Sequence, residues 1–398
     1  MPTVTVPFGT PVVISIAGRF EDDALAVLTH QVASFEAANP DIRIELVQAP
    51  RVTAERHDSF AVDLKAGDTA VDILALDYPW LAEFAAPGWL TPLDDYVKQS
   101  GLDMAAFLPA AAKASMIHGQ LMALPWTTDG GVLYYRRDLL SKYGYTLPVT
   151  WADLQRSAVD IKGREGLSSG FVWQGAPYEG LTCNCLEFLW ADGGDVLDGG
   201  GQVIFDSAQT RAALQQMADL LASDASPQQV VTFQENQALS AFRDGRAVFM
   251  RNWFYAWDRV NEEGSAVAGR VGMAPLPTSC LGGQALVLSS SGIHKTEAFR
   301  FMTFLAGYDQ QLQAALSAGQ PPARAVVFQD ASLLAASSGW QDLYAALAVT
   351  RPRPSAVPYA ELSQAIYTEV NKMLVGRQDP AATAANIQRR IKALFGQQ

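Results

Sequence analysis

The sequence is short of cysteine, histidine and positive charge, and it has no long hydrophobic run. Its cysteines are Cys183, Cys185 and Cys280, among 398 residues that include four histidines. No His or further Cys lies near the Cys-x-Cys pair to complete a metal site, so we expect no metal and no cofactor. We favour unpaired thiols that pack as small hydrophobic groups, with a Cys-x-Cys redox or metal pair as the alternative.

The shortage of positive charge bears on the partners of the chain. Lys and Arg number 29 against 41 Asp and Glu, which gives a formal net charge of −12. Such a surface repels phosphate backbones and anionic lipid, so no nucleic-acid partner is expected.

No stretch approaches the ~20 apolar residues that span a bilayer. Residues 1–18 lack the cationic start and the cleavage site of a secretory signal, and part of them resembles a strand.

The composition of the chain is that of an ordinary globular protein. Hydrophobic residues make up 49% and charged residues 18% of the chain, which is sufficient for a buried core. A chain of 398 residues exceeds the length at which single hydrophobic cores usually stop growing. We therefore expect two domains.

The first quarter of the chain alternates between strand and helix patterns. Apolar runs predict strands over 12–17, 42–47 and 71–76, and three- and four-residue spacing predicts helices over 22–38 and 53–65. This βαβαβ order is typical of an open α/β domain with helices on both faces of a parallel sheet. Ligands bind at the carboxyl ends of such strands. That rule singles out Asp77, for which a helix N-cap is the equal alternative.

The alternation restarts after Leu124 and predicts a second α/β domain. Strand patterns cover 132–135 and 247–250, helix patterns cover 138–143 and 207–221, and two further helices end the chain. Pro and Gly clusters near 275–283 and 319–322 indicate two more crossings between the domains. We predict one domain from 1–124 and 284–320 and another from 125–283 and 321–398, with the ligand cleft between them.

The most unusual segment, residues 251–257, has four aromatic residues in five positions directly after a strand. Core packing explains some of them, but Trp253 and Tyr255 can both line a cleft if they lie on a turn. Aromatic faces cover the apolar faces of sugar rings, while carboxylates and Arg bind the hydroxyl groups.

Three charged residues can supply the polar half of such a site. Asp77, Asp129 and Arg353 each lie where the chain changes from one element to the next. Paired carboxylates could instead be the acid and base of a glycoside hydrolase.

A series of short motifs runs nearly from end to end of the chain. It comprises Asn39-Pro40, Leu76-Asp77, Gly88-Trp89-Leu90, Leu124-Pro125, Asp129, Leu133-Tyr134-Tyr135-Arg136, Tyr178-Glu179-Gly180-Leu181, Arg251-Asn252-Trp253 with Tyr255-Ala256-Trp257, Ala274-Pro275-Leu276-Pro277, Leu281-Gly282-Gly283 and Arg353-Pro354. In this order the motifs resemble the trehalose/maltose-binding members of the extracellular solute-binding proteins of ABC importers.

The resemblance implies a fold and a set of site residues. The fold is a two-lobed periplasmic-binding-protein fold, in which each lobe is a doubly wound α/β sheet with flanking helices and a three-segment hinge joins the lobes. The implied ligand contacts are Arg56, Asp77, Asp129, Trp253, Tyr255 and Arg353, with Tyr178, the backbone of Gly283, and Glu21 or Asp22 as further contacts. The family usually has Trp after Leu-Gly-Gly. Here Gln284 offers an amide donor and acceptor in place of an apolar face.

The resemblance also implies a function. The chain is expected to be a substrate-binding subunit and not an enzyme, closing on a trehalose- or maltose-like disaccharide or related glycoside and delivering it to permease subunits. Because of Gln284, a glycosyl-polyol or modified sugar is the alternative ligand, and a glycoside hydrolase or a sensor domain is the alternative class. We expect a carbohydrate-binding monomer in the periplasm or outside the cell, with a lipoprotein anchor left open.

Overall fold

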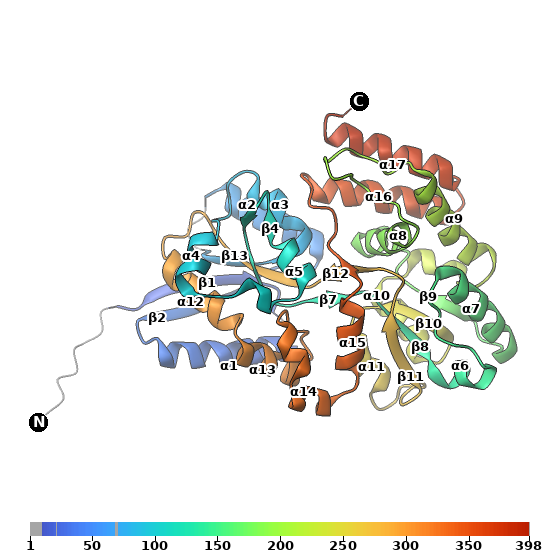
Figure 1. The fold of residues 1–398 in the computed structure, drawn as a ribbon, viewed down its shortest axis with the longest axis horizontal. Coiled ribbons are helices and arrows are strands. Elements are labelled where there is room, and N and C mark those ends of the chain that lie inside the picture. Colours follow the sequence, from blue (N-terminus) through green and yellow to red (C-terminus); the bar gives the residue numbers. More distant parts are fainter. Residues whose placement is uncertain (1–9, 21, 68–70, 398) are drawn as a thin grey trace, which may run out of the picture. The chain divides into compact units, whose positions relative to one another are not determined.

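The structure, a computed structural model, describes residues 10–20, 22–67 and 71–397. The chain forms two compact units. Unit 1 comprises Met1–Thr128 and Gly283–Ala336, and unit 2 comprises Asp129–Gly282 and Ser337–Gln398. None of the described helices is long and apolar enough to cross a bilayer. The helices and strands of both units are labelled in Figure 1.

Unit 1 is built on a five-stranded sheet in the order β2-β1-β3-β13-β6. The strands β1 (Val12–Gly18), β2 (Ile42–Gln48) and β3 (Ile73–Asp77) are parallel, with the helices α1 (Asp22–Ala38) and α2 (Thr53–Lys65) between them in sequence. This is the predicted βαβαβ order. The strand β13 (Gln284–Leu288) is inserted antiparallel between β3 and β6 (Leu124–Pro125).

Helices cover both faces of this sheet, with α1 and α13 on one side and α2 and α3 on the other (Figure 1). The apolar stripe of α1 explains its position, because Leu28 and Phe35 are buried and the Phe35 ring contacts Phe301 with centroids 4.9 Å apart. Further elements of unit 1 are α3 (Leu81–Ala85), α4 (Asp94–Ser100), α5 (Pro109–Ala114), α12 (Lys295–Leu305), α13 (Tyr308–Ala318), α14 (Ala331–Ala336), β4 (Met116–Ile117), β5 (Gln120–Leu121) and the 3-10 turns Tyr78–Trp80, Met104–Ala106 and Ala325–Gln329.

Unit 2 contains a four-stranded sheet in the order β11-β8-β10-β9. The strand β10 (Ala247–Asn252) is parallel to β9 (Ser169–Val172), whereas β8 (Val132–Arg136) is antiparallel to β10 and to β11 (Val271–Pro275), so this sheet is mixed. A smaller sheet joins β14 (Thr350–Arg351), β12 (Ser279–Gly282) and β7 (Asp129–Gly130). The helices are α6 (Arg137–Tyr143), α7 (Trp151–Glu165), α8 (Glu179–Ala191), α9 (Ala208–Ala222), α10 (Glu235–Arg243), α11 (Ala256–Asn261), α15 (Gly339–Leu347), α16 (Tyr359–Leu374) and α17 (Pro380–Leu394), with a 3-10 turn at Gln228–Thr232.

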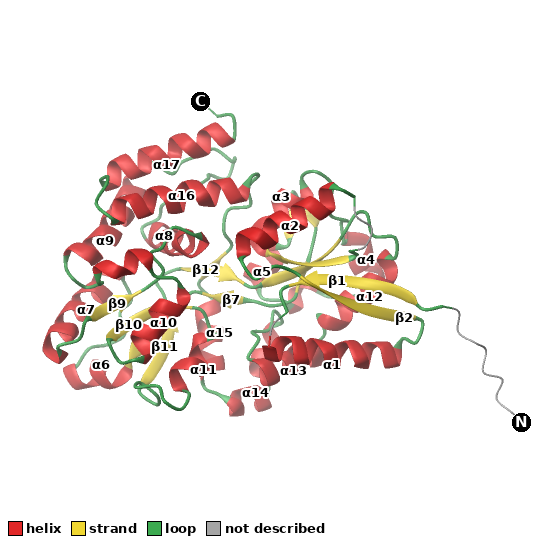
Figure 2. Ribbon diagram, turned by 180° about the vertical axis from the view of Figure 1, so that it is seen from behind, coloured by secondary structure: helices red, strands yellow, loops and turns green. Residues whose placement is uncertain are grey.

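The helix α8 lies deep inside unit 2, below the stacked helices α16 and α17 (Figure 2). Every residue from Gly180 to Trp190 is buried. Three of these residues, Thr182, Asn184 and Glu187, are polar, and a buried polar side chain needs hydrogen-bond partners. Glu187 connects α8 to Arg251 on β10 and Cys280 on β12, whereas Thr182 connects it to Ser363 on α16.

The boundaries of the two units differ from the predicted ones at all three places, and at the middle one by a single residue, because Gly283 belongs to unit 1. The first lies after Thr128 and not after Leu124, because β6 pairs with β13 and the Thr128 hydroxyl donates to the Pro322 carbonyl (2.7 Å) within unit 1. The last lies after Ala336 and not after residue 320. The Leu108 amide donates to the Ala323 carbonyl (2.8 Å), and α14 packs against α13, so residues 321–336 belong to unit 1.

Candidate functional site

Three of the predicted ligand contacts come together at the carboxyl end of β3 in unit 1. Asp77 is the last residue of β3, and Gln284 lies directly opposite it on β13. The Gln284 amide nitrogen donates to Asp77 Oδ1 (3.1 Å), and Arg56 Nη2 lies 3.5 Å from Asp77 Oδ2. The Asp77 side chain makes no helix-capping hydrogen bond, which removes the N-cap interpretation. Asp77 is 20% exposed, so its carboxylate stays accessible.

Arg56 is held in place from the helix α2. Its side chain is only 3% exposed, its guanidinium lies over the Trp80 ring at 5.3 Å, and Nη1 donates to the carbonyls of Pro50 and Arg51 (3.4 and 3.3 Å). The Arg56 Nε atom is buried without a hydrogen-bond partner among the described residues. Arg56 therefore positions Asp77 and keeps one unused donor.

Gly283 lies beside this cluster in a conformation that requires glycine. Its φ is +94°, and an added Cβ would lie 2.4 Å from the Thr127 carbonyl oxygen. Thr127 also holds the next residue, because the backbone amide of Gln284 donates to the Thr127 hydroxyl (2.9 Å). The backbone thus sets the position from which Gln284 reaches Asp77.

In unit 2 the aromatic segment after β10 divides into core and surface. Phe254 is buried, with its ring 4.5 Å from that of Trp340, and the Trp257 indole donates to the Ser337 hydroxyl (2.8 Å). Trp253 is only partly buried, and Tyr255 is 42% exposed. Core packing thus explains Phe254, whereas Trp253 and Trp257 are both only partly buried and Tyr255 is exposed.

A buried ion pair supports the Trp253 ring from below. The Arg251 guanidinium lies 4.1 Å from the ring centroid and forms a bidentate pair with Glu187 on α8, at 2.6 and 3.0 Å. Both charged side chains are fully buried. Although burial opposes the charge, Glu187 raises the pKa of Arg251 above its ordinary value.

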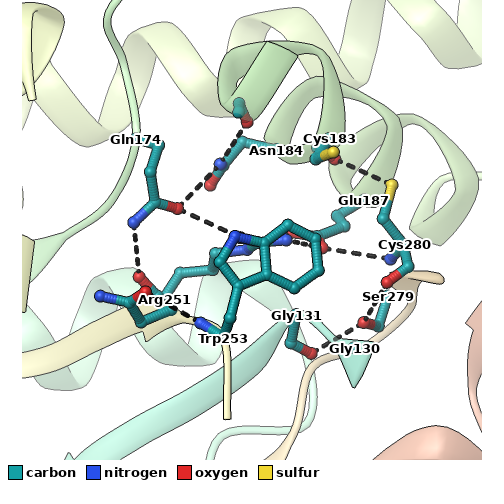
Figure 3. A network of polar contacts seen from close by, with 12 residues as sticks. Gly130, Gly131, Gln174, Cys183, Asn184, Glu187, Arg251, Trp253, Ser279 and Cys280 are labelled. Atoms are coloured by element: carbon teal, nitrogen blue, oxygen red, sulfur yellow. Dashed lines mark hydrogen bonds and ion pairs between the residues drawn. The ribbon is translucent and has the colours of Figure 1, made fainter. Parts of the chain in front are cut away.

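Neutral groups complete this network, which Figure 3 shows. Gln174 accepts from Arg251 Nη1 (3.2 Å) and donates to the Arg251 carbonyl (3.0 Å), and the Cys280 amide donates to Glu187 (3.1 Å). Gly131 is required beneath the pair, because an added Cβ would lie 2.2 Å from Glu187 Oε1. A satisfied network of this kind fixes Trp253 in one position.

Asp129 lies next to Trp253. Its Oδ1 atom accepts from the backbone amides of Gly130 (2.8 Å) and Phe254 (3.2 Å). Gly282 fills the space between the two side chains, because an added Cβ would lie 3.0 Å from the Trp253 ring and 3.2 Å from Asp129 Cβ. Burial raises the pKa of Asp129 to about 6, and the two amides and Arg251 only partly offset that effect.

Arg353 and Tyr178 have surroundings that the sequence did not indicate. Arg353 is buried, with Nη1 bound to Glu179 (2.6 Å) and Nη2 to the Leu281 carbonyl (3.4 Å), and its Nε atom has no hydrogen-bond partner among the described residues. Tyr178 folds back over the first turn of α8, because a Cβ on Gly180 would lie 2.3 Å from its hydroxyl oxygen. Arg353 as a direct ligand contact stays a prediction, and its visible role is to hold Glu179.

The remaining predictions concern Glu21 or Asp22 and the three cysteines. Glu21 lies outside the described residues, and Asp22 begins α1. The three cysteines are buried and free, and the Cys280 thiol lies 3.5 Å from the Cys183 carbonyl oxygen. Within the described residues, no group of three or more His, Cys, Asp or Glu side chains is arranged to hold a metal ion.

Sequence reasoning missed Glu235, which lies beside the aromatic residues of unit 2. It begins α10, and its Oε1 atom accepts a hydrogen bond from the Trp253 indole (3.3 Å). An acidic residue in the first turn of an amphipathic helix is an ordinary surface pattern, so the sequence carried no signal for it.

Known proteins resemble this chain over most of its length. A sequence model described as bacterial extracellular solute-binding protein matches residues 20–312. A probable ABC transporter-binding protein of Deinococcus radiodurans is 32% identical over 89% of this chain and 87% of its own. A mannitol-binding protein of Pseudomonas aeruginosa is 26% identical, with 85% and 82% covered.

The fold has relatives among solved structures as well. The maltose-bound structure of MalE3 from T. maritima is 40% identical, and the match has a TM-score of 0.85 and covers 96% of this chain and 100% of that one. This likeness agrees with the two-lobed α/β fold that the motifs implied. The chain therefore belongs to the bacterial extracellular solute-binding protein family.

Proposed function

We propose that this chain is the substrate-binding subunit of an ABC importer and that its ligand is a neutral sugar, first of all a trehalose- or maltose-like disaccharide. The observation that carries the proposal is the pairing of an accessible indole, Trp253, with the neighbouring carboxylate of Asp129 in unit 2. A sugar ring has apolar faces and hydroxyl edges, and this pairing can bind both. The maltose-bound MalE3 relative supports the same ligand class.

The unit 1 cluster fits the same kind of ligand. Asp77 holds one protein donor on each oxygen, from Gln284 and Arg56, and each oxygen keeps acceptor capacity for a ligand hydroxyl. Gln284 contributes an amide where the resembling proteins have an aromatic platform. An amide binds hydroxyl groups better than it covers a ring face, so a glycosyl-polyol is the second candidate, and the mannitol-binding relative supports that class.

Both units are proposed to contact one ligand, and binding is proposed to draw them together by bending at the three connections. The first two connections lie next to the proposed contacts, because Asp129 follows Thr128 and Gly283 follows Gly282. A ligand that contacts both units stabilises the arrangement in which both sets of contacts form. The closed complex would then be presented to the permease subunits outside the cytoplasm, without chemical change of the ligand.

A thermal-shift panel tests the proposal. Trehalose, maltose, a glucosyl-glycerol and mannitol are added to the purified chain, and a true ligand raises Tm as its concentration exceeds Kd. Asp77→Asn and Trp253→Ala should abolish the shift, whereas Asp95→Asn, an exposed acid on α4, should keep it. No shift with any neutral sugar or polyol would contradict the proposed ligand class. Release of glucose from the disaccharides would instead indicate a hydrolase.

A further inference from the structure

Glu235 is an acidic side chain at the proposed site, beside the Trp253 indole. Its Oε1 atom accepts from the Trp253 indole at 3.3 Å, and within the described parts of the chain it has no ion-pair partner. The other glutamates near the site differ, because Glu187 pairs with Arg251 and Glu179 pairs with Arg353. Glu235 is also only partly buried, and a carboxylate that accepts one hydrogen bond keeps further acceptor capacity.

Two tyrosines share the surroundings of Glu235. Burial, and then the charge of Glu235, raises the pKa of Tyr178 above its ordinary value, and the same two causes raise the pKa of Tyr255. Tyr178 precedes α8, Tyr255 follows β10, and Glu235 begins α10. Three separate elements therefore bring two phenols and an indole to one carboxylate.

The helix α10 does not need Glu235 for capping. Gln234 and Gln237 form a complete capping box, in which the Gln234 side chain accepts from the backbone of Gln237 and the Gln237 side chain accepts from the Gln234 amide (3.1 Å). The favourable position of an acid in the first helical turn contributes about 0.3–1 kcal/mol. That contribution accounts for an acid at this end of the helix but not for its placement against Trp253.

Resting on the proposed function, we propose that Glu235 is a ligand-binding residue that, together with Asp129, restricts this site to neutral polyhydroxy compounds. The free acceptor capacity of Glu235 suits ligand hydroxyl groups as donors. A phosphorylated sugar or a uronic acid would bring a negative charge toward two carboxylates in a partly desolvated place, where like charges repel strongly. The site would therefore reject the charged form of a sugar whose neutral form it binds.

The test compares neutral and anionic forms of the same compound by isothermal titration calorimetry. The pairs are maltose with maltose 1-phosphate, trehalose with trehalose 6-phosphate, and mannitol with mannitol 1-phosphate. The unaltered chain should bind the neutral member of one pair at least about 100-fold more tightly than its phosphate. Glu235→Gln should weaken binding of that neutral member by about tenfold or more, the range for hydrogen bonds to charged groups, and should reduce the discrimination against the phosphate.

The control is Glu263→Gln, which makes the same change at an exposed position of unit 2 and should leave both affinities unaltered. A purely structural role for Glu235 predicts a lower Tm of the free protein with an unchanged Kd, and that result overturns the inference. Tighter binding of a phosphate by the unaltered chain also overturns it, while the binding-protein function would stand. No binding of any member of the three pairs contradicts both.

Discussion

Asp129 keeps its carboxylate in a place that disfavours charge, because burial raises its pKa to about 6 from an ordinary 3.8. Between these two values the folded state binds more protons than the unfolded state, so the free energy of unfolding falls as pH rises from about 4 to about 6. Above that window the penalty is fully present. A residue that lowers stability at neutral pH is expected to be retained for binding.

The Asp129→Asn variant separates these two effects. The amide oxygen can still accept from Gly130 and Phe254, and the buried charge is gone. At pH 7.5 the free energy of unfolding should rise by up to about 3 kcal/mol, and at pH 4 the gain should shrink toward zero. Ligand affinity should fall. Urea titrations at both pH values check this, and a variant less stable than the unaltered protein at pH 7.5 would contradict it.

The sequence predicted where Asp77 lies in the fold better than it predicted which residues surround it. Asp77 was singled out by its place after a buried strand, and the structure confirms that place. Its contact with Gln284 depends on strand pairing across 207 positions of sequence, which no local pattern encodes. The pairing of Arg353 with Glu179 and the position of Glu235 depend in the same way on tertiary contacts.

At the scale of elements, the junction of β10 and α8 depends on a fully buried ion pair. Removing one member of such a pair leaves the other charge without compensation. Glu187→Gln should therefore destabilise the protein by about 3–5 kcal/mol, measured by urea unfolding. Tryptophan fluorescence should change too, because Arg251 lies against the Trp253 ring.

A surface pair provides the control for this prediction. Glu165 binds Lys142 at 2.6 Å, but the Lys142 side chain is 58% exposed. Glu165→Gln makes the same chemical change and should cost less than about 1 kcal/mol. An equal loss in the free energy of unfolding in the two variants would contradict a larger contribution from the buried pair.

The loop between β12 and β13 depends on Gly283 in the same manner. Gly283→Ala should destabilise the protein by about 1–3 kcal/mol, because φ is positive and the methyl group would collide with Thr127. Gly163→Ala is the matched control, since Gly163 lies inside α7 with nothing within 4 Å of an added Cβ. That change should stabilise the helix by up to about 1 kcal/mol. Thermal unfolding of both variants gives the comparison, and a neutral Gly283→Ala would be inconsistent with this geometry.

Sequence periodicity located these elements well and left their arrangement in sheets open. The helix α2 has the predicted bounds, and β3 begins two residues later than predicted. The insertion of β13 between β3 and β6 was not predicted, because periodicity identifies a strand without its neighbours.

At the scale of the whole molecule, the chain passes between two units three times. If one ligand contacts both units, saturation should reduce the radius of gyration measured by small-angle X-ray scattering. Asp77→Asn at the same ligand concentration should stay at the ligand-free value. A ligand that raises Tm without any compaction would contradict closure and leave binding to one unit as the explanation.

The number of units was readable from length, but their limits were not. The restart of the α/β pattern indicated a connection near 124, and a Pro and Gly cluster indicated one near 320, where the structure has them after Thr128 and Ala336. Turn residues indicate where the chain bends, whereas the limits of a compact unit depend on contacts such as that of Thr128 with Pro322.

The placement of β13 also limits when unit 1 can fold during synthesis. This strand lies between β3 and β6 in the unit 1 sheet, yet it follows all of residues 129–282 in the chain. A ribosome that has made the first 128 residues has produced β3 and β6 without the strand that joins them. Unit 1 can complete its core only after Leu288 has emerged, so the part of the protein made first cannot finish folding first.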